Sequence, residues 1–321
     1  MESTIFFVNN SPYCFWDKDL KSRNLTFIEN LEANYFEFQA NYLLSSIESD
    51  ETTDSEKSHL SITLRNTYSH SLESFFAILL AAIQAPDLVP AWLLKYKNRD
   101  LYKLVDKIQE GKFFRNKLGL KECSFKKIAD VILSINLEDK EKQKNIKNKF
   151  ASLWNRFASD FSKKSFQDEY NSIKHGFRIT EGGFDLRFTK EEKPGETPED
   201  AEFRTLGSSK YGSTYFVTEQ VSPNKPHYMI HENNRNWSLK RYARELVLVS
   251  NSINNIQTFI KLKHGKKENY SIPQDLSFLD VYLEDSSGVT DFNFRDNYKF
   301  NDEALLGREE LIKSFDEVFQ P

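Results

Sequence analysis

Apolar residues recur every three or four positions over most of the chain, and this spacing predicts long amphipathic helices. The clearest run covers residues 55–85, where a broad apolar stripe extends from Leu60 to Ile83 and stops before Pro86. Its second half is apolar nearly all round, so we expect it at the centre of a helical bundle. The same spacing predicts helices over residues 25–47, 101–110, 138–175, 236–263 and 303–319, with short helices after Pro90 and Ser124.

The pattern changes at Gly176, which is placed to end a helix in the left-handed conformation. Residues 177–180 and 184–188 flank Glu181-Gly182-Gly183, a combination typical of a β-hairpin. Residues 215–218 and 227–230 predict two further strands. The sequence therefore predicts a mainly α protein, a multi-helix bundle with a small antiparallel β insertion at about residues 177–231 and an irregular C-terminal tail.

We expect four regions from this pattern. They are a helical domain over residues 1–176, a hairpin or small-sheet insertion over 177–235, a core helix that returns to the bundle over 236–265, and a tail with a terminal helix over 266–321. Residues 5–8 predict one short strand before the first helix. No internal repeat of 20–50 residues is present.

Composition supports a packed core, because 27 Phe among 321 residues compensate for a hydrophobic share of only 39%. Cys14 and Cys123 are too few for a disulfide framework and lack metal-type spacing. The first residues do not resemble a signal peptide, and no window approaches 18 consecutive apolar residues. We therefore expect a cytoplasmic protein without a membrane partner.

The charges are unevenly distributed along the chain. Residues 95–190 hold 23 Lys/Arg against 13 Asp/Glu, or +10, whereas the remainder holds 21 against 35, or −14. A basic middle segment favours a polyanionic partner such as RNA. The alternative is a solvated, lysine-rich helix face with no ligand.

Two stretches carry candidate chemistry, and the first lies inside the run of residues 55–85. On a helix, Asn66, His70 and Glu73 share one face, where Glu73 could orient the imidazole and Asn66 could bind a ligand. Arg65 lies roughly 140° around the helix from His70, but its long side chain could still reach a phosphate held at that edge. A titratable histidine beside a cation is the minimal equipment for metal-free RNA cleavage.

The second stretch ends the run of residues 138–175. Asn171, Lys174 and His175 share one helical face, and Tyr170 occupies the place that Arg65 has in the first stretch. If the two helices were neighbours, His70 and His175 could act as base and acid around one phosphate. Arg65 and Lys174 would then neutralise its charge.

Arg65-Asn66-x-x-x-His70 resembles the R-N-x-x-x-H form of the motif of HEPN domains. These are helical nucleotide-binding or metal-independent RNase domains found in bacterial toxin–antitoxin and anti-phage systems, and they usually dimerise around a shared cleft. The resemblance implies that Arg65 and His70 are catalytic, that the partner is RNA, that the chain forms a homodimer and that no cofactor is needed. Tyr170-Asn171-x-x-x-His175 is similar but lacks the arginine.

Structural alternatives exist for each of these residues. His70 could be partly buried against Glu73 or Tyr68, with Arg65 in a surface ion pair. His175 and Lys174 could simply complement a helix C-terminus. A second alternative for the whole chain is a non-catalytic helical module that binds a nucleotide, a nucleic acid or a protein.

Other patterns carry less chemistry. His227, His231 and Glu232 have metal-ligand residue types but lie in a predicted strand without a third well-placed ligand, so we expect no metal site. Phe113, Phe114, Phe150 and Phe157 lie among lysines and could stack on bases, although helical spacing is more typical of core positions. Glycine-rich phosphate loops and zinc-protease motifs are absent from the sequence.

Overall fold

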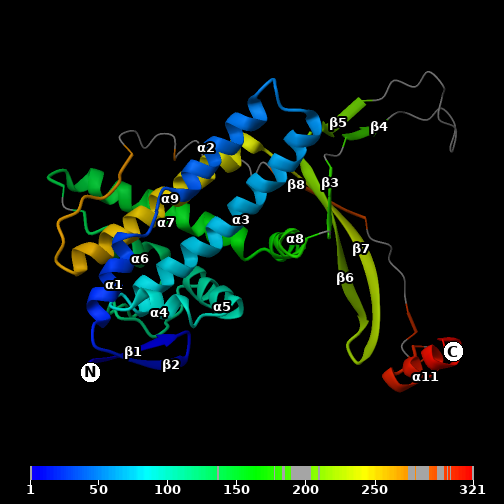
Figure 1. Cartoon of the computed structure of the whole chain (residues 1–321), viewed down its shortest axis with the longest axis horizontal. Helices are drawn as coiled ribbons and strands as arrows, with labels where there is room; N and C mark the ends of the chain where they lie inside the picture. Colours follow the sequence, from blue (N-terminus) through cyan, green and yellow to red (C-terminus); the bar gives the residue numbers. More distant parts are fainter. Residues whose placement is uncertain are drawn as a thin grey trace. The chain divides into compact units, whose positions relative to one another are not determined.

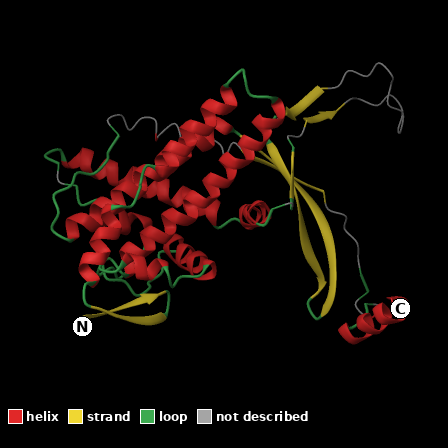
Figure 2. Ribbon diagram, viewed as in Figure 1, coloured by secondary structure: helices red, strands yellow, loops and turns green. Residues whose placement is uncertain are grey.

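In a computed structural model, the chain forms two compact units. The first comprises Met1–Tyr170 with Leu239–Gly288, and the second comprises Asn171–Ser238 with Val289–Pro321. The structure describes residues 2–135, 137–176, 178–182, 185–188, 204–208, 210–273, 279, 289–294, 300–301, 303 and 305–319. Helices dominate the first unit and strands the second (Figure 2). The prediction of a mainly α protein with small antiparallel sheets is confirmed.

The first unit is a helical bundle around one long helix, α3, which packs against α2, α4, α5, α7 and α9 (Figure 1). An N-terminal hairpin contacts α1, α3 and α4. The elements of the first unit are β1 (Glu2–Val8) and β2 (Ser11–Asp17), which form the hairpin, and α1 (Leu20–Glu29), α2 (Tyr35–Glu48), α3 (Asp54–Gln84), α4 (Val89–Leu93), α5 (Asn98–Gln109), α6 (Phe125–Ile132), α7 (Lys140–Phe161), α8 (Lys164–Lys174) and α9 (Leu239–Lys263). The last turn of α8 passes into the second unit.

Helix α3 begins and ends where the sequence predicts. The Thr53 hydroxyl accepts a hydrogen bond from the backbone N–H of Glu56, and the Glu56 carboxylate accepts one from the backbone N–H of Thr53. This reciprocal cap satisfies two backbone donors at the helix start. Beyond Leu72, nearly every side chain of the helix is buried, which confirms its central position.

Two of the predicted long helices are interrupted. In place of one helix over residues 25–47, α1 and α2 are separated by residues 30–34, where the Gln257 amide donates to the carbonyl oxygens of Ile28 and Leu31. Residues 138–175 form α7 and α8, separated at Ser162 and Lys163. The Ser162 hydroxyl donates to a carboxylate oxygen of Asp106 in α5 at 3.0 Å. Both breaks are fixed by side chains from other elements.

The described residues of the second unit form two antiparallel sheets. A four-stranded sheet has the order β3-β6-β7-β8, and β4 pairs with β5. The expected hairpin around Glu181-Gly182-Gly183 is wrong, because β3 pairs with β6 rather than with β4. The predicted strands at residues 215–218 and 227–230 lie within the longer β6 and β7. The strands are β3 (Ile179–Glu181), β4 (Asp185–Phe188), β5 (Arg204–Ser208), β6 (Gly212–Ser222), β7 (Lys225–Trp237) and β8 (Val289–Phe294), followed by helix α11 (Arg308–Phe319).

Membrane insertion was not expected from the sequence. Across the described residues, every helix is too short or too polar to cross a bilayer.

Candidate functional site

Arg65 lies in the interior of the first unit. Its side chain is 2% exposed, and its Nε and Nη2 atoms donate to one carboxylate oxygen of Glu169, at 3.1 and 2.6 Å. The guanidinium carbon also lies 4.7 Å from the ring centre of Tyr242 and 4.8 Å from that of Phe166. Burial alone would lower the pKa of Arg65, but the adjacent Glu169 carboxylate raises it above its usual value. The residue is therefore a charged partner in a buried ion pair, and the alternative of a surface ion pair is wrong.

His70 and Asn66 lie elsewhere on the same helix. The His70 side chain is exposed, with its ring 5.6 Å from that of Phe36 in an edge-to-face arrangement. Asn66 is half-buried. Arg65 thus faces the core while His70 faces solvent, and the structure does not bring guanidinium and imidazole to one accessible surface. A catalytic role for His70 stays a prediction.

Glu73 faces a group of tyrosines. The Tyr170 hydroxyl donates to a Glu73 carboxylate oxygen at 3.0 Å. Burial raises the pKa of Tyr102 to about 12, and the nearby negative charge of Glu73 adds to the shift. Burial and the Glu73 charge also raise the pKa of Tyr96 and of Tyr170. Among the described residues, the hydrogen bond of Glu73 thus comes from a tyrosine and not from His70.

The second stretch lies at the end of α8. Asn171, Lys174 and His175 are exposed, and Gly176 follows them with a φ of +59°. The left-handed Gly176 confirms the predicted helix end. These three residues belong to the second unit, whereas Arg65 and His70 belong to the first. The two motifs therefore do not form a site within one unit.

The histidines of β7 contact other residues of the second unit. His227 Nε2 lies 3.0 Å from the carbonyl oxygen of Leu306, and His231 Nε2 lies 3.1 Å from a carboxylate oxygen of Glu219. The described residues contain no cluster of three or more metal-binding side chains. These contacts do not indicate that either histidine binds a ligand.

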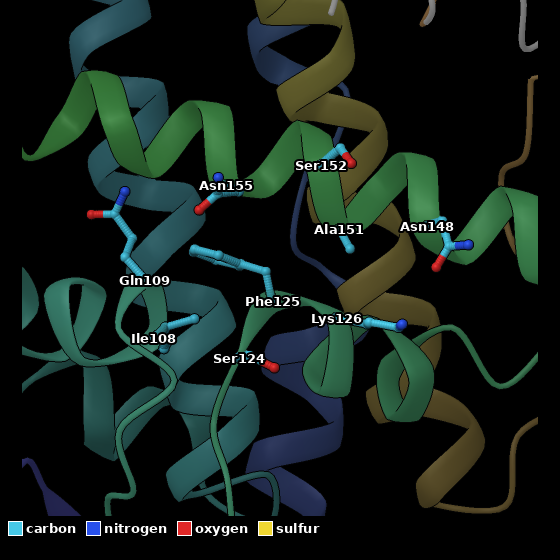
Figure 3. Close-up of a pocket in the computed structure, with 9 residues that line it drawn as sticks. All are labelled: Ile108, Gln109, Ser124, Phe125, Lys126, Asn148, Ala151, Ser152 and Asn155. Atoms are coloured by element: carbon cyan, nitrogen blue, oxygen red, sulfur yellow. The ribbon is translucent and has the colours of Figure 1, made fainter.

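A polar groove of about 440 Å³ lies between α5, α6 and α7, in the basic part of the first unit (Figure 3). In Figure 3, Asn148, Ser152 and Asn155 lie along α7, and Phe125 and Lys126 lie across from them at the start of α6. The full lining is Ile108, Gln109, Ser124, Phe125, Lys126, Asn148, Ala151, Ser152 and Asn155. We define these nine residues as the amide groove.

Local structure fixes the walls of the amide groove. Ser124 caps α6 by accepting a hydrogen bond from the backbone N–H of Lys127. The Gln109 amide donates to the Ser159 hydroxyl at 3.3 Å, which joins α5 to α7. Lys147 of α7 donates to the backbone oxygen of Asp130 at 3.1 Å, which joins α7 to α6. Lys126 is exposed and forms no ion pair with any described residue.

Sequence reasoning missed the groove because most of its polar residues are uncharged. Asn148, Ser152 and Asn155 follow one another at steps of four and three, the spacing of a single helix face. An uncharged polar row within a lysine-rich helix was therefore the available signal.

Comparison with known proteins adds no identification: no family model, no curated protein and no solved structure matches the chain. Function must therefore be argued from the side chains of this chain alone.

Proposed function

We propose that the helical unit binds single-stranded RNA along the basic surface of α5, α6 and α7, as a binding module rather than as a nuclease. The observation that carries the proposal is the amide groove, which combines Lys126 with the amides of Gln109, Asn148 and Asn155. Side-chain amides present both donors and acceptors, so they can bind base edges as well as phosphate oxygens. Base edges are accessible in this way when the bases are unpaired.

The charge around the amide groove supports the same partner. Residues 95–149, which include α5, α6 and the N-terminal part of α7, hold 16 Lys/Arg against 8 Asp/Glu, or +8. Lys127, which follows Lys126 on α6, and Lys144 of α7 are also exposed. A strand of phosphates would release counterions on binding such a surface, which makes affinity fall as salt rises.

The buried ion pair of Arg65 weighs against the nuclease alternative. Its guanidinium is held by Glu169 and aromatic rings, so a phosphate could reach it only after the core had opened. The exposed His70 does not share an accessible surface with this buried guanidinium. The positions of Arg65 and His70 therefore favour RNA binding without cleavage.

The test is fluorescence anisotropy with a labelled ten-nucleotide single-stranded RNA at several salt concentrations. We expect salt-dependent binding, and we expect K126Q/K127Q to reduce the slope of log affinity against log salt by about 1.4, or about 0.7 for each lost phosphate contact. The matched control is Lys240→Gln, which removes an exposed lysine of the same unit on α9. This control should leave the slope unchanged.

Three outcomes would contradict the proposal. The first is the absence of RNA binding, and the second is RNA binding that K126Q/K127Q leaves intact. The third is cleavage of the RNA in EDTA that His70→Ala abolishes, because this result would restore the nuclease alternative. Recovery of uncut RNA from wild-type protein supports the module.

A further inference from the structure

A second pocket, of about 310 Å³, lies between the N-terminal hairpin, the end of α3 and the loop after α5. Its lining residues are Ile5, Phe6, Phe7, Gln84, Phe113, Arg115, Asn116 and Lys117. We call it the hairpin pocket. Its volume is at the lower end of the range of small-molecule sites and is suited to a group of nucleotide size.

Hydrogen bonds from Gln84 hold the three segments of the hairpin pocket together. Its amide oxygen accepts from the backbone N–H of Asn9 at 3.1 Å and from Trp92 Nε1 at 3.3 Å, and its amide nitrogen donates to the carbonyl oxygen of Arg115 at 2.8 Å. Trp92 Nε1 also donates to the Phe7 carbonyl oxygen at 3.1 Å. The walls are therefore formed before any ligand arrives, which reduces the entropy lost on binding.

Asn116 fixes the loop side of the pocket. Its amide nitrogen donates to the carbonyl oxygens of Phe114 and Leu120, both at 2.9 Å. Its amide oxygen accepts from the backbone N–H groups of Leu118 and Leu120. The Asn116 side chain thus forms its hydrogen bonds within the loop. The polar groups that remain for a ligand are the neighbouring cationic side chains.

The apolar walls of the hairpin pocket face outward. Ile5 is 61% exposed and Phe113 is 59% exposed, whereas their sequence neighbours Phe6 and Phe114 are buried in the core. An exposed aromatic ring beside a preformed apolar cavity offers a flat surface to a planar ligand.

The charge at the rim of the hairpin pocket indicates which chemical group the other end of the ligand carries. The Arg115 guanidinium carbon lies 4.8 Å from the centre of the Phe7 ring, and Arg115 is exposed without an ion pair to any described residue. The neighbouring Lys117 Nζ lies 3.4 Å from a carboxylate oxygen of Asp87. Arg115 can therefore accept an anion while it stays stacked on Phe7. A ligand with an aromatic plane and one attached anion meets both requirements.

We infer that the hairpin pocket holds one nucleotide of a bound RNA strand, with its base against Phe113 and its phosphate on Arg115. The inference rests on the proposed RNA binding and adds a site where a base is stacked rather than only a backbone held. Stacking accepts any base, so this site anchors the strand without reading its sequence.

The experiment compares two probes, the labelled ten-nucleotide RNA and an abasic sugar–phosphate oligomer of the same length. We expect Phe113→Ala to weaken RNA binding about tenfold, as loss of one stacked base does, and to leave the abasic probe unchanged. Arg115→Gln should weaken both probes, because both carry phosphate. The matched control is Phe38→Ala, which removes an aromatic ring of similar exposure from α2 and should change neither affinity.

The outcomes separate this inference from the proposed function. If RNA binds but Phe113→Ala affects both probes equally or neither, the stacking site is wrong. If wild-type protein binds neither probe, the proposed function itself fails. Unchanged thermal unfolding of Phe113→Ala, expected for an exposed ring, shows that a loss of affinity is not a loss of fold.

Discussion

At Arg65, the guanidinium is enclosed by Glu169 and three aromatic rings, so the two charges depend on each other. Glu169→Gln should lower the free energy of unfolding by about 3 kcal/mol, because it leaves the guanidinium buried without a counter-charge. The double variant R65M/E169L should recover most of this loss, since it removes both charges. Urea denaturation measures each value.

An exposed pair provides the control for this prediction. Lys163 and Asp160 lie 3.1 Å apart near the surface, and Lys163→Met should change the free energy of unfolding by less than about 1 kcal/mol. If Glu169→Gln has as small an effect as Lys163→Met, the assignment of Arg65 to the stability of the core is wrong.

The burial of Arg65 could not be predicted from its own surroundings in the sequence. Its helical placement was correctly predicted, but its partner Glu169 is 104 positions away. Phe166 and Glu169 lie one turn apart on α8, and Tyr242 comes from α9. Helical spacing identifies which residues share a face, but it does not reveal which face another helix covers. The exposure of His70 depended on the same missing information.

Among the elements, β6 begins at a position where only glycine fits. A Cβ atom on Gly212 would overlap the carbonyl oxygens of Gly182 and Arg235 and the side-chain oxygen of Asn236. We expect Gly212→Ala to destabilise the four-stranded sheet by about 1–3 kcal/mol, as overpacking does. Hydrogen exchange of the β6 and β7 amides measures this effect.

The neighbouring glycine tests whether the effect comes from close approach. A Cβ atom on Gly182 would meet only the Thr214 hydroxyl, at an ordinary 3.6 Å. Gly182→Ala should therefore leave exchange in β6 nearly unchanged. If the β6 amides of Gly182→Ala and Gly212→Ala were equally protected from hydrogen exchange, this result would contradict the close approach at Gly212.

The local sequence predicted the type of each element better than it predicted which other elements it packs against or pairs with. The apolar stripe of α3 is a local signal, and it predicted that helix correctly; the capping pair Thr53 and Glu56 is local as well. The breaks before α2 and before α8 depend on side chains of distant elements, Gln257 and Asp106, so the period alone predicted helices that were too long. Pairing of β3 with β6 likewise depends on contacts across the chain.

For the whole molecule, the raised tyrosine pKa values predict a loss of stability in alkali. The pKa of Tyr102 is about 12 in the folded state, against about 10 for an unfolded chain. Between these values the unfolded state loses its proton first, so this contribution to stability is complete below pH 10 and falls as pH rises toward 12. Urea unfolding at pH 9, 10 and 11 measures the decline.

Tyr102→Phe isolates this contribution, because phenylalanine keeps the ring that stacks on Phe161 but has no proton to lose. Its stability should decline less steeply than that of wild type over the same range. Parallel curves for the two proteins would show that burial of Tyr102 does not contribute to the alkaline transition.

The carboxamide of Gln84 links Asn9, Trp92 and Arg115, which come from three separate parts of the chain. A substitution at position 84 would remove a hydrogen bond from each of the three at once, so we expect these segments to change together during evolution. In homologous sequences, we expect changes at position 84 to be accompanied by changes in the hairpin turn and in the loop after α5. Covariation of this kind would reveal the three-way junction from sequences alone.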